Sequence, residues 1–323
     1  MLKSLHGIKK MMNMNTRANT LAAIRHDPAV RVPVFDGTVW DAVHLGGNFK
    51  YESWTDHWGT VWQAELPGMV PTDVGHPLSD ITNLDAYLFP NPAALTWTAA
   101  DQRHLDALKK KDILVGGCHV KFVCERLCCL MGMDNFMIAL YEEPERLQKL
   151  LDGIVAYNRA CIRRLLDLGI DTLHVSEDLG IQQDLMISPE LFRRFLLPAY
   201  EACFEEVKQR GVIIDFHSCG AVEKIIPDLI AVGVDILNPV QVTANDRRRV
   251  KEMVRGKMAV LGGINSQVVH TGTPEEIRCE VRNAFEVWAP GGGWIAAPDQ
   301  VLTGASAENV QVFWESCWAL AGK

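Results

Sequence analysis

A histidine and a cysteine lie two residues apart at the end of an apolar run. The segment "VIIDFHSCGAV" carries His217 and Cys219 directly after the run at 212–216. Imidazole and thiolate are both good metal ligands, so the pair could bind a metal or take part in catalysis. Buried free cysteines and hydrogen-bonded core histidines are also common, and the interpretation therefore depends on the elements around the pair.

Other polar side chains follow apolar runs in the same way. They are Asp36 after 32–35, Cys118 and His119 after 113–117, Glu177 and Asp178 after 172–176, Asn238 and Gln241 around the end of 234–238, and Asp299 after 294–297. Neighbouring residues of a strand point to opposite faces, so at most one residue of the pair Cys118–His119 lines a pocket. We expect that residue to be His119.

The apolar runs recur with a rhythm typical of alternating strands and helices. Amphipathic segments such as 144–169 and 188–211 separate them, and Ser188 with Pro189 predicts a helix start. This alternation predicts a parallel sheet. The seven runs are 32–35, 113–117, 172–176, 212–216, 234–238, 258–262 and 294–297.

An eighth strand within 36–112 would close the sheet into a barrel. The main alternative, an open doubly wound sheet, is expected to show a glycine-rich turn after its first strand, and "VFDGTVW" is not one. We therefore predict an α/β fold, a single (β/α)8 TIM barrel over residues 15–323. Residues 40–95 are expected to form an inserted cap, and residues 1–14 a flexible N-terminal extension.

In such a barrel, chemistry is located at the carboxyl ends of the strands. The strand period of two places His217 and Cys219 on one face together with Asp215, while the apolar Ile214 and Phe216 face the helix layer. The pair is thus predicted to share the catalytic rim, which favours a metal-binding role.

The same period applied to 172–178 directs Asp178 inward, because Leu173 and Val175 take the outward face. Strand ends often break this alternation, so Glu177 remains an equal candidate.

Composition excludes several partners. The chain has 323 residues with a net charge of −8 and no dense run of lysine or arginine, so we expect neither nucleic acid nor a membrane surface as a partner. Nine cysteines, an odd number, without an apolar leader predict reduced thiols and a cytoplasmic location.

Several motifs together resemble the uroporphyrinogen decarboxylase-like superfamily. They are "TDHWGTVW", "GHPLSDITNLDAYLFPNP", "VSEDLGIQQDLMISPELFRRFLLPAY", "FHSCGAVEKIIPDLIAVGVDILNPVQ" and "APGGGWIAAPDQVLTGASAENV". The resemblance covers about residue 15 to the end of the chain and implies a single (β/α)8 barrel.

The resemblance implies one of two activities. The decarboxylases act without a metal on an octacarboxylate tetrapyrrole held by an arginine-bearing N-terminal arm, which "RVPVFDGTVWDAV" lacks. The other branch comprises zinc methyltransferases that exchange methyl groups with a corrinoid protein. Its coenzyme M members bind zinc through His-x-Cys and a distant third cysteine, and His217 and Cys219 match the first part of that motif.

The third ligand departs from the coenzyme M pattern, because "WIAAPDQVL" offers Asp299 and Gln300 and no cysteine. Some members that demethylate aryl methyl ethers use carboxylate ligands. By that resemblance the third ligand here is Glu177 or Asp178, with Asp299 next in order, and Asp178 is also assigned a catalytic role.

A site with one histidine, one thiolate and one carboxylate leaves a zinc position open for a substrate oxygen. Together with this site, the resemblance implies a zinc-dependent methyltransferase that moves a methyl group between a small substrate, in first place an aryl methyl ether undergoing O-demethylation, and a corrinoid protein. The cobalamin of that partner would alternate between cob(I)alamin and methylcobalamin. The residues expected to contact substrate are Asp36, Trp58, His119, Phe122 and Asn238, with Phe35 and Trp40 as further aromatic walls.

Other functions stay open on the sequence alone. They are a uroporphyrinogen decarboxylase-type reaction, methyl transfer to a thiol of the coenzyme M type, and a barrel that serves only as a binding subunit. A Schiff-base enzyme would need a lysine at a strand end, where Lys121 is the candidate.

Overall fold

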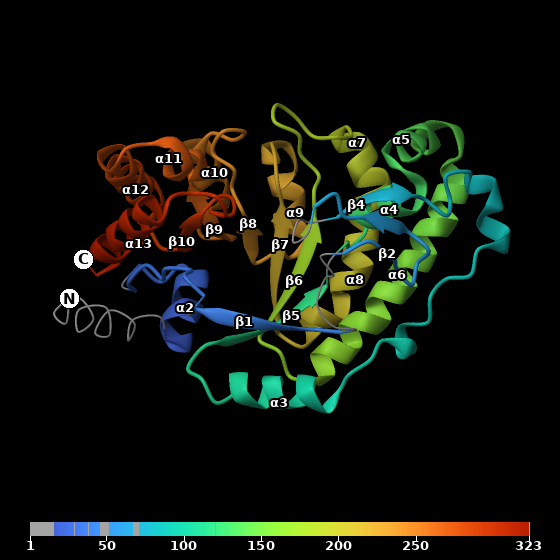
Figure 1. Cartoon of the computed structure of the whole chain (residues 1–323), viewed down its shortest axis with the longest axis horizontal. Helices are drawn as coiled ribbons and strands as arrows, with labels where there is room; N and C mark the ends of the chain where they lie inside the picture. Colours follow the sequence, from blue (N-terminus) through green and yellow to red (C-terminus); the bar gives the residue numbers. More distant parts are fainter. Residues whose placement is uncertain are drawn as a thin grey trace.

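The structure is a computed structural model that describes residues 16–28, 30–37, 39–45, 52–66, 71–119 and 121–322. The predicted extension at 1–14 lies outside these residues. The main element is a seven-stranded parallel sheet with the strand order β1-β5-β6-β7-β8-β9-β10 (Figure 1). Its strands are β1 (Trp40–His44), β5 (Leu114–His119), β6 (Thr172–Glu177), β7 (Ile213–Ser218), β8 (Ile236–Asn238), β9 (Ala259–Ile264) and β10 (Trp294–Pro298).

An eighth parallel segment extends the sheet at β10. Val34 forms a parallel bridge with Ala296, and the backbone N–H of Phe35 donates to the carbonyl of Ala296 at 2.9 Å. The ring of Phe35 then packs edge-to-face on Trp40 of β1, with ring centroids 4.9 Å apart. This contact links the two ends of the curled sheet, and the α/β barrel expected from the sequence is confirmed.

Helices alternate with the strands and cover the outside of the sheet (Figure 1). Ser188 begins one of them as expected, since its side chain accepts a hydrogen bond from the backbone N–H of Leu191. The α-helices are α2 (Arg17–Ile24), α3 (Ala99–Leu108), α4 (Cys124–Met131), α5 (Met133–Glu142), α6 (Pro144–Asp167), α7 (Pro189–Leu191), α8 (Leu197–Gln209), α9 (Ile226–Val232), α10 (Arg247–Val254), α11 (Ser266–Thr271), α12 (Pro274–Trp288) and α13 (Ala307–Ala321). Short 3-10 turns are η1 (Ile81–Ala86), η2 (Pro92–Ala94) and η4 (Glu223–Ile225), and η3 (Phe192–Leu196) is a π-helical turn.

The cap differs in extent from its prediction over 40–95. Residues 40–44 form β1 of the barrel, which is the eighth strand expected within 36–112. A separate three-stranded antiparallel sheet follows, made of β2 (Trp54–Thr55), β3 (Val61–Gln63) and β4 (Thr72–Gly75). It is tied to α4 by a buried ion pair between Asp56 and Arg126 at 3.1 Å. The sequence does not predict β1 because the short segment "WDAVH" mixes apolar and polar residues and does not form a continuous apolar run.

Two apolar clusters lie on the two sides of the barrel strands. Ile214 and Phe216 belong to the large outer cluster shared with the helices, whereas Ile213 packs against a smaller cluster with Ile236 and Ile295. The alternation predicted for β7 is therefore confirmed. Each fully buried side chain of this size contributes about 1.5–3 kcal/mol, so the strand is held firmly in register.

Within the described part of the chain, no helix combines the length and apolarity needed to cross a membrane.

Candidate metal centre

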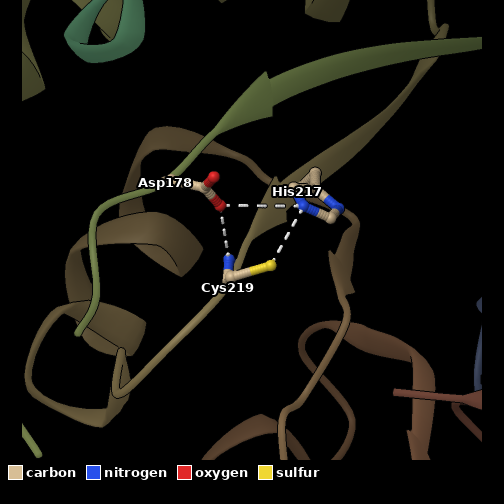
Figure 2. Close-up of side chains that lie close together, drawn as sticks. All are labelled: Asp178, His217 and Cys219. Atoms are coloured by element: carbon tan, nitrogen blue, oxygen red, sulfur yellow. Dashed lines mark hydrogen bonds and ion pairs between the residues drawn. The ribbon is translucent and has the colours of Figure 1, made fainter. Parts of the chain in front are cut away.

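Three potential metal ligands meet at the carboxyl ends of β6 and β7. One ligand atom each from Asp178, His217 and Cys219 lies within 4.8 Å of the other two. The Nε2 atom of His217 is 3.4 Å from the sulfur of Cys219 and 3.8 Å from Oδ1 of Asp178. Figure 2 shows the three side chains converging from the end of β6 and from β7. Among the described residues this is the one group of at least three such ligands.

The loops after β6 and β7 bring these side chains together through direct hydrogen bonds between the two loops. The N–H of Cys219 donates to Oδ1 of Asp178 at 3.1 Å, and the N–H of Ala221 donates to the carbonyl of Ile181 at 2.8 Å. Gly180 and Gly220 lie at the crossing point. A Cβ atom on Gly220, whose φ is +76°, would lie 2.3 Å from the carbonyl of Gly180. Only glycine therefore allows this approach.

The dimensions of the cluster fit a zinc ion. With Zn–N and Zn–O bonds near 2.0–2.1 Å and a Zn–S bond near 2.3 Å, tetrahedral ligands of this kind are separated by roughly 3.3–3.6 Å. The 3.4 Å between His217 and Cys219 lies in this range, and the 3.8 Å between His217 and Asp178 exceeds it by a few tenths of an ångström, which a small rotation of the half-exposed Asp178 side chain would remove. Three ligands of this kind leave one position open, which is typical of a catalytic zinc site.

Burial prepares the histidine for metal binding. Removal from water lowers the pKa of His217, with the neighbouring His174 as a second cause, so the imidazole is neutral and can ligate. Burial also raises the pKa of Cys219 to about 11. A cation at this point would offset that effect, because metal binding favours the thiolate.

Glu177 is not part of the cluster, which corrects its candidacy as a ligand. It faces outward, is fully buried, and its carboxylate accepts backbone N–H groups at the start of α4 and the hydroxyl of Tyr200 at 2.9 Å. The N–H donors are Val123, Cys124 and Glu125 at 2.7, 2.9 and 2.8 Å. Burial raises the pKa of Glu177 to about 7, with the charge of Glu125 as the next cause. The residue holds α4 to β6.

Asp299 is also occupied elsewhere. It is 2% exposed, and its carboxylate accepts the N–H of Val242 at 3.0 Å and both the N–H and hydroxyl of Ser266 at 2.9 and 2.7 Å. Its neighbour Gln300 reaches the centre instead, with the amide nitrogen 3.1 Å from the sulfur of Cys219.

Three residues expected to contact substrate lie in the packed interior. His119 pairs in register with Val175, whose side chain faces outward, and its Nε2 atom lies 2.8 Å from Oδ1 of Asn158 on α6. Cys118 pairs in register with His174. Phe122 is fully buried, with its ring stacked on those of Tyr200 and Phe204. Trp58, 2% exposed, packs edge-to-face on Tyr157 beneath the cap. These three side chains therefore pack against the helices outside the barrel and do not line a substrate pocket.

A cavity of about 370 Å³ opens beside the metal centre. Asn238, which pairs in register with His217, lines it as expected, and so does Phe35. Asp36 is half-buried at the end of the adjoining segment. The other lining residues are His217, Pro239, Leu261, Ala297, Pro298, Asp299, Gln300, Val301, Leu302, Val310 and Trp314. This set is mostly apolar and contains neither lysine nor arginine.

A second polar group, not predicted from the sequence, lies near the centre. Glu125 binds Lys121 at 2.6 Å and accepts the hydroxyl of Ser176 at 3.0 Å, and its charge acts on His217. The spacing of four residues between Lys121 and Glu125 was the available signal. On the barrel interior, Nδ1 of His174 lies 2.7 Å from Asp215, and the rings of His174 and His217 are 6.0 Å apart.

One solved structure shares this fold over nearly the whole chain. The chain superposes on a methyltransferase from Methanosarcina mazei with a TM-score of 0.72 at 17% identity, covering 93% of this chain and 97% of that one. A B12-independent methionine synthase from a Shewanella species, in complex with selenomethionine, gives a TM-score of 0.47 at 13% identity over 71% of this chain and 67% of that one. No curated protein matches the sequence significantly.

A family profile identifies the chain more directly than these structures do. The profile described as uroporphyrinogen decarboxylase (URO-D) matches residues 103–320, which is well over half of the sequence and includes all three residues of the metal centre. The chain therefore belongs to the uroporphyrinogen decarboxylase (URO-D) family.

Proposed function

We propose that the protein is a zinc-dependent methyltransferase that takes the methyl group of an aryl methyl ether and passes it to a corrinoid protein. The observation that carries this proposal is the cluster of Asp178, His217 and Cys219 at the edge of an apolar cavity. The fold shared with a methyltransferase agrees with it.

Asp178, His217 and Cys219 would hold the zinc ion. When bound, zinc supplies a Lewis acid that neutralises the negative charge developing on an ether oxygen. One carboxylate in the ligand set suits an oxygen substrate better than a set with two thiolates would. The side chain of Asp178 is 51% exposed and that of His217 27%, so a substrate can reach the centre from the rim.

The cavity favours a neutral aromatic substrate. Phe35 and Trp314 offer ring faces and edges, Leu302 adds apolar surface, and His217 marks the end at which the methoxy group would lie. Asn238 can orient a polar substituent of the ring through its amide. The absence of lysine and arginine from the described lining residues disfavours both an octacarboxylate tetrapyrrole and the anionic thiol coenzyme M.

The methyl acceptor would be the reduced cobalamin of a separate corrinoid protein. The cobalamin would supply the electron pair for the new bond to the methyl carbon, while the pair of the broken oxygen–methyl bond would stay on the oxygen, which would take up a proton from solvent on release. The chain itself would contribute orientation and the exclusion of water from the apolar cavity.

The test mixes the zinc-loaded protein with a reduced corrinoid protein and 2-methoxyphenol and follows the cobalamin spectrum. We expect conversion of cob(I)alamin to methylcobalamin, and at least a 100-fold loss of rate in Cys219→Ala. Cys279→Ala is the matched control, because Cys279 is a free, exposed cysteine on α12.

Two outcomes would contradict the proposal. One is an unchanged cobalamin spectrum with every methoxylated aromatic offered. The other is decarboxylation of uroporphyrinogen at an enzymatic rate, which would establish the activity for which the family is named.

A further inference from the structure

Gln300 reaches the metal centre from a distant strand. It follows β10 by two residues, and three positions separate β10 from β7 in the strand order of the sheet. Its amide nitrogen nevertheless donates to the sulfur of Cys219 at 3.1 Å. A donor this close to a ligand sulfur acts directly on the electron density of that ligand.

The turn that carries Gln300 is fixed by its neighbour. Asp299 is buried, and its carboxylate accepts three hydrogen bonds. The donors are Val242, in the loop after β8, and Ser266, in the loop after β9. In addition, the N–H of Asp299 donates to the carbonyl of Ile264 at 2.8 Å. A side chain on such a braced turn is held toward the centre before any ligand binds.

Gln300 also lines the cavity that opens beside the metal centre. His217 and Phe35 line the same cavity, so the amide that contacts the Cys219 sulfur also borders the space proposed for the substrate. A substrate seated in the cavity would therefore meet the open side of the centre beside this amide.

We infer that Gln300 is a positioning residue of the metal centre, whose N–H bond to the Cys219 sulfur fixes the thiolate and withdraws negative charge from it. The inference rests on the proposed zinc site. A thiolate that accepts a hydrogen bond donates less charge to its metal, so the metal stays the stronger Lewis acid that an oxygen leaving group requires.

The test uses Co²⁺ in place of zinc, because charge transfer from a thiolate ligand to Co²⁺ gives an absorption band in the near ultraviolet. Wild type, Gln300→Met and Gln182→Met are compared, with Cys219→Ser to assign the band. Methionine keeps the length of glutamine and removes the donor. Gln182 is the matched control, since its amide lies on the same rim and donates to the carbonyl of Thr243 at 2.8 Å.

In Gln300→Met we expect the charge-transfer band to move to longer wavelength, and zinc affinity, measured by chelator competition, to fall about 10-fold to 100-fold. Gln182→Met should match wild type in both. An unchanged band and affinity in Gln300→Met would overturn the role of Gln300. No thiolate band in wild type would overturn the metal centre and this inference with it. Neither readout needs a methyl donor or a corrinoid, so failed methyl transfer alone would overturn only the proposed function.

Discussion

Two neighbouring acids at the end of β6 have opposite surroundings. Asp178 is half-exposed and its Oδ1 atom lies 3.8 Å from His217, so it can complete a metal site. Glu177 is fully buried and accepts three backbone N–H groups and a tyrosine hydroxyl. The alternation of a strand is the physical cause, because it sends one side chain into the barrel and the next under α4.

Amide substitutions should separate the two acids. Asp178→Asn removes the anionic charge that helps to hold zinc, so the zinc content should fall from about one per chain to a small fraction. The free energy of unfolding should change little. Glu177→Gln should leave the zinc content unchanged and lower the free energy of unfolding by about 1–3 kcal/mol. The new amide NH₂ would face backbone N–H donors at the start of α4, so one buried N–H would lose its acceptor. Metal analysis and urea denaturation give both values. Full zinc in Asp178→Asn would remove Asp178 from the ligand set.

The sequence predicted the inward residues of the barrel better than the outward ones. His217, Cys219 and Asp178 follow from the period of two once strand ends are located. Because alternation often fails at strand ends, the sequence alone leaves Glu177 as a ligand candidate. Aromatic and imidazole groups near a rim resemble pocket walls, so the sequence alone favours substrate contacts for His119, Trp58 and Phe122. Only tertiary contacts, such as His119 with Asn158, show that they serve packing.

At the scale of elements, the metal centre depends on two loops that touch. The loop after β6 carries Asp178 and the loop after β7 carries Cys219, and they cross at Gly180 and Gly220. The cluster therefore forms only if these two glycines lie against each other. The Asp178–Cys219 hydrogen bond at 3.1 Å then sets the spacing of the ligands.

Gly220→Ala should damage this crossing without unfolding the barrel. The new Cβ would lie 2.3 Å from the carbonyl of Gly180, so the loops must separate, and zinc affinity should fall at least 10-fold. Gly211→Ala is the matched control, because its φ of +67° is similar and a Cβ there meets no atom within 4 Å. That control should cost about 1–2 kcal/mol of unfolding free energy and leave zinc affinity unchanged. Equal zinc affinity in the two variants would contradict the role of the crossing.

The elements themselves followed from the sequence where hydrophobic runs were long and separated by amphipathic helices. All seven runs correspond to parallel segments of the barrel. The exception was β1, whose mixed sequence "WDAVH" has partly buried polar residues and was assigned to the cap. The contribution of α13 to the cavity, through Val310 and Trp314, was also missed, because it arises from the packing of the last helix against the rim.

At the scale of the whole molecule, the barrel separates stability from chemistry. Its large apolar clusters lie between the strands and helices and in the lower barrel interior, while Asp178, His217 and Cys219 lie on the rim. None of the three is required to fill those clusters. This arrangement differs from that of small zinc domains, in which the metal supplies the folding free energy itself.

If zinc binds as proposed, its removal should therefore leave the protein folded. We expect the chelator-treated wild type and His217→Ala to keep the same far-ultraviolet circular dichroism and Tm values within about 2 °C of each other, since the substitution leaves no cavity in the core. Zinc at 100 times its Kd should stabilise the wild type by about 2.7 kcal/mol and raise its Tm by a few degrees, while His217→Ala shows no such rise. Cys279→Ala should respond to zinc as the wild type does. A site at the rim is not expected to hold the barrel together. Cooperative unfolding on addition of a chelator at 25 °C would therefore contradict this prediction and show that the metal supports the fold.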